Sequence, residues 1–261
     1  MKKKIYPSDL TDSQWHHIKE LFETEKQFGR PRQLDLRRVV EAILYLLTTG
    51  CQWRYLPADY PKWQSVYYYF RKFERTGKWR RIHDRLRAET REKSGKHKHP
   101  TAGSIDSQSV KTVGVSSRFG YDAGKKVKGR KRHLLVDTLG LVLALTVTTA
   151  EVQDRDGCRL LLKKLSGSCK KLRKVWVDGG YRGLLLDWVA LHFKFVLSVV
   201  LRSDKRKEFI VLPKRRVVER TFAWLSHHRR LSKDYEVFER TSETLIYLAM
   251  TRLMLRRIQP R

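Results

Sequence analysis

Three carboxylate side chains, Asp106, Asp178 and Glu219, lie at separate points of a chain that is otherwise dominated by positive charge. They occur in the segments SIDSQSVK (104–111), VWVDGGYRG (175–183) and RRVVERTFAWL (215–225). If the fold brings them together, their oxygens are the ligands that hard cations such as Mg²⁺ prefer. Two such ions about 3.5–4 Å apart can hold both the attacking and the leaving oxygen of a phosphodiester. The pattern therefore points to an enzyme that cuts or joins nucleic acid.

Each carboxylate also has a structural interpretation when it is taken alone. Asp106 could be a turn residue or an exposed strand residue, Asp178 could cap the next helix, and Glu219 could interact with a helix dipole. Asp178 is the best placed for function, because it ends an apolar strand before two glycines. Ligands of open α/β sheets bind at the carboxyl ends of strands. The residues alone leave both interpretations open.

The composition favours a nucleic-acid partner. The chain has 57 Lys and Arg against 27 Asp and Glu, and a formal net charge of +30 over 261 residues. Such an imbalance is typical of proteins that bind a polyanion. A ribosomal-type protein and an anionic-membrane binder are the alternatives, and the spread of charge along the whole chain disfavours the membrane. The longest apolar stretch, 139–147, is too short to span a bilayer.

Cysteine usage indicates a reduced, cytosolic protein. Cys51, Cys158 and Cys169 have no spacing typical of a zinc site or a disulfide framework. We therefore expect free thiols and a cytoplasmic location.

The first part of the chain, residues 1–93, reads as a helical domain, and the polar segment SGKHKHPTAG (94–103) reads as a linker. Thr11 and Gln14 have the spacing of a capping box, and Gly50 has the position of a helix-ending glycine. The predicted helices begin after Thr11 and near Asp35, and two more cover about 63–76 and 78–92.

From residue 104 onward the pattern favours an α/β fold, a mixed sheet with flanking helices. Short runs rich in β-branched residues predict strands within 104–110 and 131–149, the latter a hairpin that turns at 137–140. The remaining predicted elements are helices over 156–165 and 184–192, strands over 174–177 and 195–201, a helix from about 216 and a final helix over 241–257.

The third predicted helix is the candidate for reading DNA sequence. Val66, Phe70 and Phe73 are spaced to face a core. A second face of the same helix carries side chains that can reach base edges and phosphates in a major groove: Gln64, Tyr68, Arg71 and Arg75. A solvated face is the alternative.

Two further basic segments are candidates for contact with DNA phosphates. The run GKKVKGRKRH (124–133) contributes Lys125, Lys126, Lys128, Arg130 and Lys131. Phosphate contacts of this kind position a duplex without reading its sequence. Arg30 and Arg32, on either side of Pro31, could form an arm in a minor groove, or an ordinary basic loop.

Other acidic residues have simpler interpretations. We expect Asp154 and Asp156 to cap the helix that follows them, Asp137 to lie in a turn, and Asp122 to make local hydrogen bonds within a Gly-rich loop.

A long, ordered set of motifs resembles the DDE transposases of bacterial insertion sequences, specifically the insertion-sequence-five group. The resemblance covers nearly the whole chain. The motifs are YPSDLTDSQW (6–15), GRPRQLDLRRVVEAILYLLTTGCQWRYLP (29–57), AGSIDSQSVKT (102–112), GYDAGKKVKGRKRHLLVDTLGL (120–141), VQDRDG (152–157), DGGYRG (178–183), VVERTFAWL (217–225), RRLSKDYE (229–236) and TRLMLRR (251–257).

The resemblance implies a fold and an activity. It implies an RNase H-like DDE catalytic domain over 104–261, preceded by an all-α, helix-turn-helix-like DNA-binding domain. Asp106, Asp178 and Glu219 correspond to the first, second and third catalytic carboxylates, which would hold two Mg²⁺ ions, with Mn²⁺ as a substitute. The implied reactions are hydrolysis at the terminal inverted repeats of the element and strand transfer into target DNA.

The resemblance also implies partners. A homodimer would hold two DNA ends in a synaptic complex, in the bacterial cytoplasm and at the nucleoid when DNA is bound. Related proteins often carry a basic residue several positions after the catalytic Glu. Here that stretch is Ser226, His227 and His228, so Arg229 and Arg230 just beyond become the candidate contacts.

Two other functions remain open from the sequence. One is an RNase H-like nuclease or resolvase that cuts without strand transfer. The other is a non-catalytic DNA-binding regulator whose acidic residues are structural.

Overall fold

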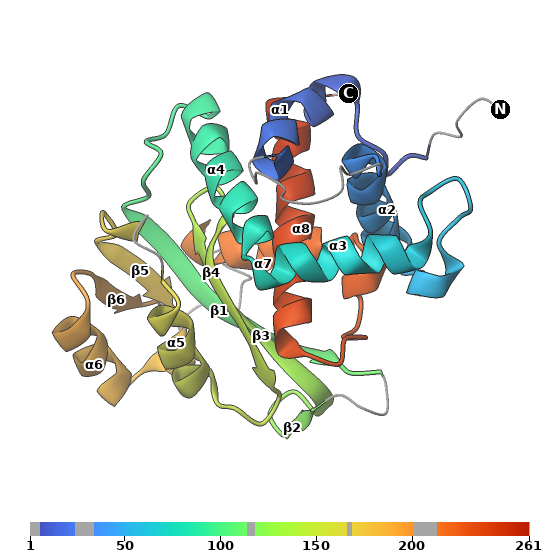
Figure 1. Ribbon diagram of the computed structural model, residues 1–261. Coiled ribbons are helices and arrows are strands. Elements are labelled where there is room, and N and C mark those ends of the chain that lie inside the picture. The colour runs from blue at the N-terminus through green and yellow to red at the C-terminus, as the bar shows by residue number, and fades with distance from the viewer. Residues whose placement is uncertain (1–5, 24–33, 114–117, 166–168, 201–212, 261) are drawn as a thin grey trace.

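The computed structural model of the chain describes residues 6–23, 34–113, 118–165, 169–200 and 213–260 (Figure 1). Arg30 and Arg32, the predicted minor-groove arm, lie outside these described residues. Most of the predicted helices and strands appear close to their expected positions.

The N-terminal helices begin and end at the predicted local signals. Helix α1 (Asp12–Glu23) starts with a capping box, in which the Gln14 amide donates to Thr11 Oγ1 at 3.2 Å and the Thr11 amide donates to Gln14 Oε1 at 3.3 Å. Asp35 caps α2 (Leu36–Thr49) by accepting from the Arg37 amide at 2.9 Å. Gly50 ends α2 in the left-handed region, with φ of 75°. A short 3₁₀ helix, η1 (Trp53–Tyr55), then leads to α3 (Trp63–Arg75) and α4 (Lys78–Lys93).

The sheet combines an antiparallel and a parallel half. Strands β1 (Ala102–Lys111), β3 (Val127–Asp137) and β4 (Val142–Thr149) pair antiparallel, and β5 (Lys174–Val177) and β6 (Val196–Val199) extend the other edge of β1 in parallel. A further strand, β2 (Gly120–Asp122), pairs with the start of β3 and was not predicted. Its three residues are too short to show an alternating pattern.

Helices cover both faces of the sheet. One buried cluster joins Ile105, Leu135 and Val177 of the strands to α5 (Asp154–Lys163) and α6 (Leu184–His192). The other cluster joins Leu134 and other strand residues to α7 (Pro213–Ser226), α8 (Glu239–Ile258) and the N-terminal helices. Figure 1 shows α8 (red) among α1–α4.

The helical region and the sheet region share one core. Helix α8 packs against α2, α3, α4, α7 and β4. Residues 94–101 connect α4, which ends at Lys93, to β1, which begins at Ala102, so the last two residues of the predicted linker 94–103 belong to the strand. The N-terminal helices nevertheless bury their apolar faces against an element that lies at the other end of the sequence.

No helix in the described part of the chain combines the length and the apolar character that a membrane span requires.

Candidate active site

Strand β1 presents Asp106 to the face of the sheet that carries α7 and α8. Side chains of a strand alternate between faces. Ile105 belongs to the cluster beneath α5, and Ser107 Oγ donates to Asp154 Oδ1 of α5 at 2.7 Å. Asp106 pairs across the strands with Leu134, which belongs to the cluster beneath α7 and α8. Asp106 therefore lies on the opposite face from α5.

The pairing of β1 with β5 brings Asp178 to the level of Asp106. The two parallel strands pair Ser104 with Trp176, and both aspartates lie two residues farther along the chain, Asp106 within β1 and Asp178 directly after β5. Continuing this register puts Asp106 and Asp178 side by side on one face. Asp178 Oδ1 also accepts from the Gly180 amide at 2.8 Å and caps the short helix η3 (Gly179–Tyr181). The capping role considered for Asp178 is thus present, although at a 3₁₀ turn rather than at α6.

Helix α7 carries Glu219 over the same face. Val218, Phe222 and Leu225 form its buried side, and α7 packs against β1, β3 and β5. Glu219 is exposed and lies at the edge of this buried side, next to Val218. The apolar residues of α7 therefore determine which side of the helix packs on the sheet, and the Glu219 carboxylate lies at the border of that side.

The turn between β3 and β4 anchors α7 in this position. Thr221 Oγ1 donates to the Gly140 carbonyl at 2.8 Å. Gly140 has φ of 84°, and a Cβ there would lie 2.9 Å from Thr221 Oγ1, so the close approach requires glycine. Asp137, only 1% exposed, accepts from the amides of Leu139 and Leu141 and pairs with Arg91 of α4. The prediction of Asp137 as a turn residue is confirmed.

The three carboxylates do not form a closed metal-binding cluster. In the described part of the chain, no group of three or more His, Cys, Asp or Glu side chains is close enough to hold a metal ion. Extension of the register of β1 and β5 aligns Asp106 with Asp178, and α7, the helix of Glu219, packs on the same face. The donor atoms available there are carboxylate oxygens, which fit a hard divalent cation.

Tyr181 is a member of this region that the sequence interpretation did not single out. Its side chain is fully buried and its hydroxyl has no hydrogen-bond partner within the described structure. Burial, followed by the negative charge of Asp106, raises the pKa of Tyr181 well above its usual value, and Asp154 and Asp178 add to the effect. The hydroxyl of Tyr181 is therefore a buried polar group within the hydrophobic cluster beneath α5, under the electrostatic influence of the two aspartates. The only signal in the sequence was its place in the DGGYRG motif.

The predicted basic run divides into an exposed and a buried part. Lys125, Lys126 and Lys128 are exposed in the turn and start of β3. Arg130 is 0% exposed, donates to the Val237 carbonyl at 2.7 Å and pairs with Asp234 at 3.2 Å. In this fold, Arg130 is therefore a structural residue that holds the segment before α8 against β3, and not a surface contact as predicted.

Lys131 is also buried, at 5% exposed, and its ammonium lies 3.2 Å from Asp122 and 3.3 Å from Asp154. It too departs from the predicted surface role. Burial raises the pKa of Asp122, but hydrogen bonds from Ser109 and the Lys125 amide and the contact with Lys131 lower it to about 2. The predicted local hydrogen bonds of Asp122 are confirmed.

The acidic residues before α5 do not occupy the cap position. Gln153 is the N-cap, and Asp154 and Asp156 lie in the first turn of the helix. Asp156 pairs with Arg159 at 3.5 Å on the surface. The prediction that these two residues cap the helix was wrong, because Asp154 lies one position and Asp156 three positions after the cap, although acidic residues in a first turn still favour the helix dipole.

Helix α3 presents the predicted apolar and polar faces. Val66, Phe70 and Phe73 are buried as predicted. Of the residues proposed to read DNA, Gln64, Tyr68 and Arg75 are exposed.

Arg71 differs from the other residues of the polar face. It pairs with Glu74 at 2.7 Å and donates to Thr241 Oγ1 of α8 at 3.1 Å. These contacts tie Arg71 to the protein rather than leaving it extended into solvent.

The two arginines after α7 have different environments. Arg229 is exposed, whereas Arg230 is 8% exposed and donates from Nε to Glu236 Oε1 at 2.7 Å. His228 is buried as well, and burial lowers its pKa to about 4. Of the two predicted phosphate contacts, Arg229 is the accessible one.

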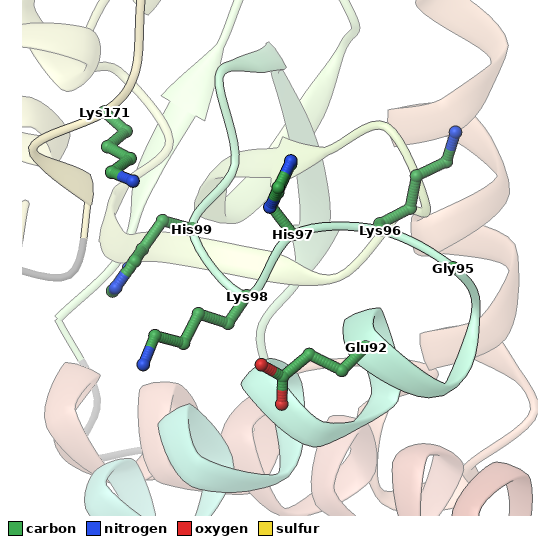
Figure 2. Close-up of a pocket in the computed structure, with 7 residues that line it drawn as sticks. All are labelled: Glu92, Gly95, Lys96, His97, Lys98, His99 and Lys171. Atoms are coloured by element: carbon green, nitrogen blue, oxygen red, sulfur yellow. The ribbon is translucent and has the colours of Figure 1, made fainter.

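The segment between α4 and β1 forms a basic cavity of about 410 Å³ (Figure 2). Lys96, His97, Lys98, His99 and Lys171 line it, with Glu92 at its edge. The Arg91 side chain donates to the His97 carbonyl at 2.7 Å and so fixes the segment to α4. From the sequence, this segment is predicted only to be a linker.

Comparison with known protein families gives two matches along the chain. Residues 97–254 match the family model described as "Transposase DDE domain". Residues 10–83 match the family model described as "Putative transposase of IS4/5 family (DUF4096)". No curated protein matches the chain. The first match covers more than half of the chain and includes all three candidate carboxylates, β1 to β6 and most of α8.

Proposed function

The chain belongs to the IS4/IS5 family of DDE transposases, and on that premise we propose that Asp106, Asp178 and Glu219 are its catalytic carboxylates. The catalytic domain is RNase H-like, DNA is the substrate, and the protein is a DNA transposase. The assignment of individual residues rests on the geometry of the sheet and of α7.

The observation that carries the proposal is the register of β1 and β5. Continued two residues past Ser104 and Trp176, this register would bring Asp106 beside Asp178 on the face against which α7 packs, and Glu219 lies exposed at the border of the packed side of α7. The three residues come from elements far apart in sequence, and each of those elements is fixed by buried neighbours. If the three carboxylates were only turn residues or exposed strand residues, nothing would require them to lie on one face of the sheet.

We propose that the three carboxylates hold two Mg²⁺ ions, for which Mn²⁺ can substitute. When bound, the ions would activate a water or a DNA 3′-hydroxyl and stabilise the leaving oxygen. The protein itself provides the rigid strand ends that hold the two aspartates and the anchored helix that holds the glutamate. Lys125, Lys126 and Lys128 would bind phosphates of the same DNA.

The helical region would recognise the terminal inverted repeats of the element. Residues 1–93 would act as the DNA-binding domain, 94–103 as the linker and 104–261 as the catalytic domain, with a core shared between them. The exposed face of α3 with Gln64, Tyr68 and Arg75 is the surface proposed to read the ends. Joining two ends requires at least a homodimer in the synaptic complex.

The proposal is tested with purified protein, Mg²⁺ and linear DNA that carries the flanking ends of the element. We expect cleavage at the ends that EDTA abolishes, and joining of pre-cut ends to a target plasmid. Cleavage without joining would indicate a nuclease or resolvase. Specific binding to the ends without metal-dependent cleavage would indicate a regulator, and either result would overturn the proposed chemistry.

A further inference from the structure

A groove lined by aromatic rings lies between the N-terminal helices and the segment that enters α8. It has a volume of about 370 Å³, with η1 and α3 on one side and the segment around 235–241 on the other. Figure 1 shows α3 lying across α8 in this part of the molecule. The rings in its lining are Trp53, Trp63, Tyr67, Tyr235 and Phe238.

Several of these rings are unusually exposed. Tyr67 is 39% exposed, Tyr235 38% and Phe238 51%. Aromatic side chains contribute most when they are buried, and a concentration of exposed ones marks a binding surface. The rings of this groove come from both regions of the chain, so the groove exists only because those regions pack together.

Arginine side chains lie over the rings of the groove. Arg54 lies 5.5 Å from the centroid of Trp63, Arg71 lies 5.6 Å from Phe238, and Arg230 lies 5.6 Å from Tyr235. Such guanidinium–ring pairs provide flat cationic surfaces.

The charge of the groove is positive at its accessible side. Arg71 and Arg230 are paired with Glu74 and Glu236. Arg54 is exposed, and no carboxylate in the described part of the chain pairs with it. The groove thus combines apolar ring faces with an accessible cation, an arrangement suited to a ligand that has both a flat aromatic face and a negative charge.

We propose that this groove binds unpaired nucleotides of DNA. The bases would stack on the rings and on the guanidinium planes, and Arg54 would hold a phosphate. Aromatic side chains within a positive groove are the usual means of binding single-stranded nucleic acid. An intact duplex does not fit this description, because its bases are already paired and stacked on one another.

The groove adjoins the duplex-reading surface proposed for α3. Tyr67 lines the groove, and its neighbour Tyr68 lies on the exposed face of the same helix. Unpaired nucleotides at a DNA end could therefore occupy the groove while the adjacent duplex contacts α3. The inference rests on DNA as the substrate, and it is independent of the roles given to Asp106, Asp178 and Glu219.

The test measures binding of short fluorescent oligonucleotides to the full chain by anisotropy. The probes are a thymidine oligonucleotide, the same oligonucleotide with abasic sugars in its centre, and a blunt duplex. For the wild-type protein we expect the abasic probe to bind at least about fivefold more weakly than the thymidine probe, since each stacked base contributes that much or more. This comparison requires no substitution.

Two variants assign the effect to the groove. Trp63→Leu and Tyr67→Leu should each weaken binding of the thymidine probe by about tenfold and remove the discrimination against the abasic probe. Duplex binding should change by less than about twofold, because the phosphate contacts remain. Tyr55→Leu is the matched control, since Tyr55 is 74% exposed in η1, beside the groove residue Trp53, but does not itself line the groove. Thermal melting confirms that each variant is folded.

Equal binding of the thymidine and abasic probes to the wild-type protein would overturn the inference. So would a loss in Tyr55→Leu as large as the loss in Tyr67→Leu. If the groove variants impair self-association but not oligonucleotide binding, the occupant of the groove is a second copy of the chain, and the inference is likewise overturned. Because the test uses no cleavage, its failure leaves the proposed function standing, and a failure of cleavage leaves the ring-dependent binding standing.

Discussion

Two groups of carboxylates in this molecule have opposite surroundings. Asp137 and Asp234 are 1% and 2% exposed and are paired with arginines from distant elements, Arg91 and Arg130. Asp106, within β1, and Asp178, directly after β5, are half-buried and accept from amides one or two residues along the chain, and Glu219 is exposed on α7. We refer to the first two as the structural carboxylates and to the other three as the active-face carboxylates.

The difference shows that residue type does not determine the role of a charge. A buried carboxylate with a fixed cation connects elements, and removal of one partner leaves the other charged and desolvated. A carboxylate on an accessible face can instead bind a ligand, because it is not enclosed by the protein. Substitutions in the two groups should therefore separate stability from activity.

The largest expected effect is the loss of catalysis in the active-face group. Asp106→Asn, Asp178→Asn and Glu219→Gln should each reduce cleavage by about 10³-fold or more, because several kcal/mol of metal-dependent stabilisation disappear. End binding and the melting temperature should stay near their wild-type values. The measurement is cleavage of end-bearing DNA in Mg²⁺.

Asp154→Asn is the control for this prediction, since Asp154 lies on the opposite face of β1, in contact with Ser107. It should be much milder than the other three substitutions. Robust cleavage by Asp178→Asn would remove Asp178 from the catalytic group.

The next effect concerns stability in the structural group. Asp234→Ala leaves Arg130 buried beside an empty position, and also removes the acceptor of Ser242 Oγ at 2.9 Å. The free energy of unfolding should fall by about 3–5 kcal/mol. Urea unfolding followed by circular dichroism measures the loss.

Asp156→Ala is the matched control for the stability prediction, because its pair with Arg159 is on the surface. It should change the unfolding free energy by less than about 0.5 kcal/mol. A similar result for both variants would mean that the Asp234 network adds no stability.

Two buried histidines lead to a prediction about how the stability of the folded chain depends on pH. Burial lowers the pKa of both His133 and His228 to about 4. Below pH 6.5 these two histidines bind protons in the unfolded chain but remain neutral in the folded chain. Their full contribution to the free energy of unfolding is therefore present above pH 6.5 and is lost as the pH falls toward 4. Between pH 7.5 and 5, each histidine should reduce the unfolding free energy by about 2 kcal/mol.

Urea unfolding at the two pH values provides the measurement. His228→Asn should reduce this pH dependence, whereas His227→Asn should not, because His227 is exposed. An unchanged pH dependence in His228→Asn would contradict the assignment.

The smallest effect separates the two parts of the basic run. Replacing Lys125, Lys126 and Lys128 with alanine should reduce the slope of log affinity against log salt by about 0.9 for each DNA phosphate that these lysines neutralise. The reduction should be the same for any duplex sequence. Arg130→Met should instead alter stability and leave the slope unchanged. If the lysine variant keeps the wild-type slope, these lysines form only a solvated surface.

Local signals in the sequence determined much of the fold. The capping box at Thr11 and Gln14, the cap at Asp35 and the glycine at position 50 identified helix boundaries without any tertiary information. The turn at 137–140 was also predictable, because Asp137 and Gly140 provide the chemistry that a tight turn needs.

Long-range packing was not accessible in the same way. Arg130 looked like its exposed neighbour Lys128, and only the segment 234–237, a hundred residues away, makes it a buried residue. The alignment of Asp106 with Asp178 likewise depends on strand register. Tyr181 and the rings of the groove carried no periodic pattern that distinguishes a binding surface from ordinary burial.

The position of α8 in the chain has a consequence for synthesis. The ribosome makes α8 after every other helix and strand of the described chain, yet α8 fills the core on which α2, α3, α4, α7 and β4 all pack. While the nascent chain lengthens, those elements expose the apolar surfaces that α8 later covers. Newly made protein should therefore complete its fold in one late step, and translation that stops before residue 239 should yield aggregation-prone fragments rather than a folded DNA-binding domain.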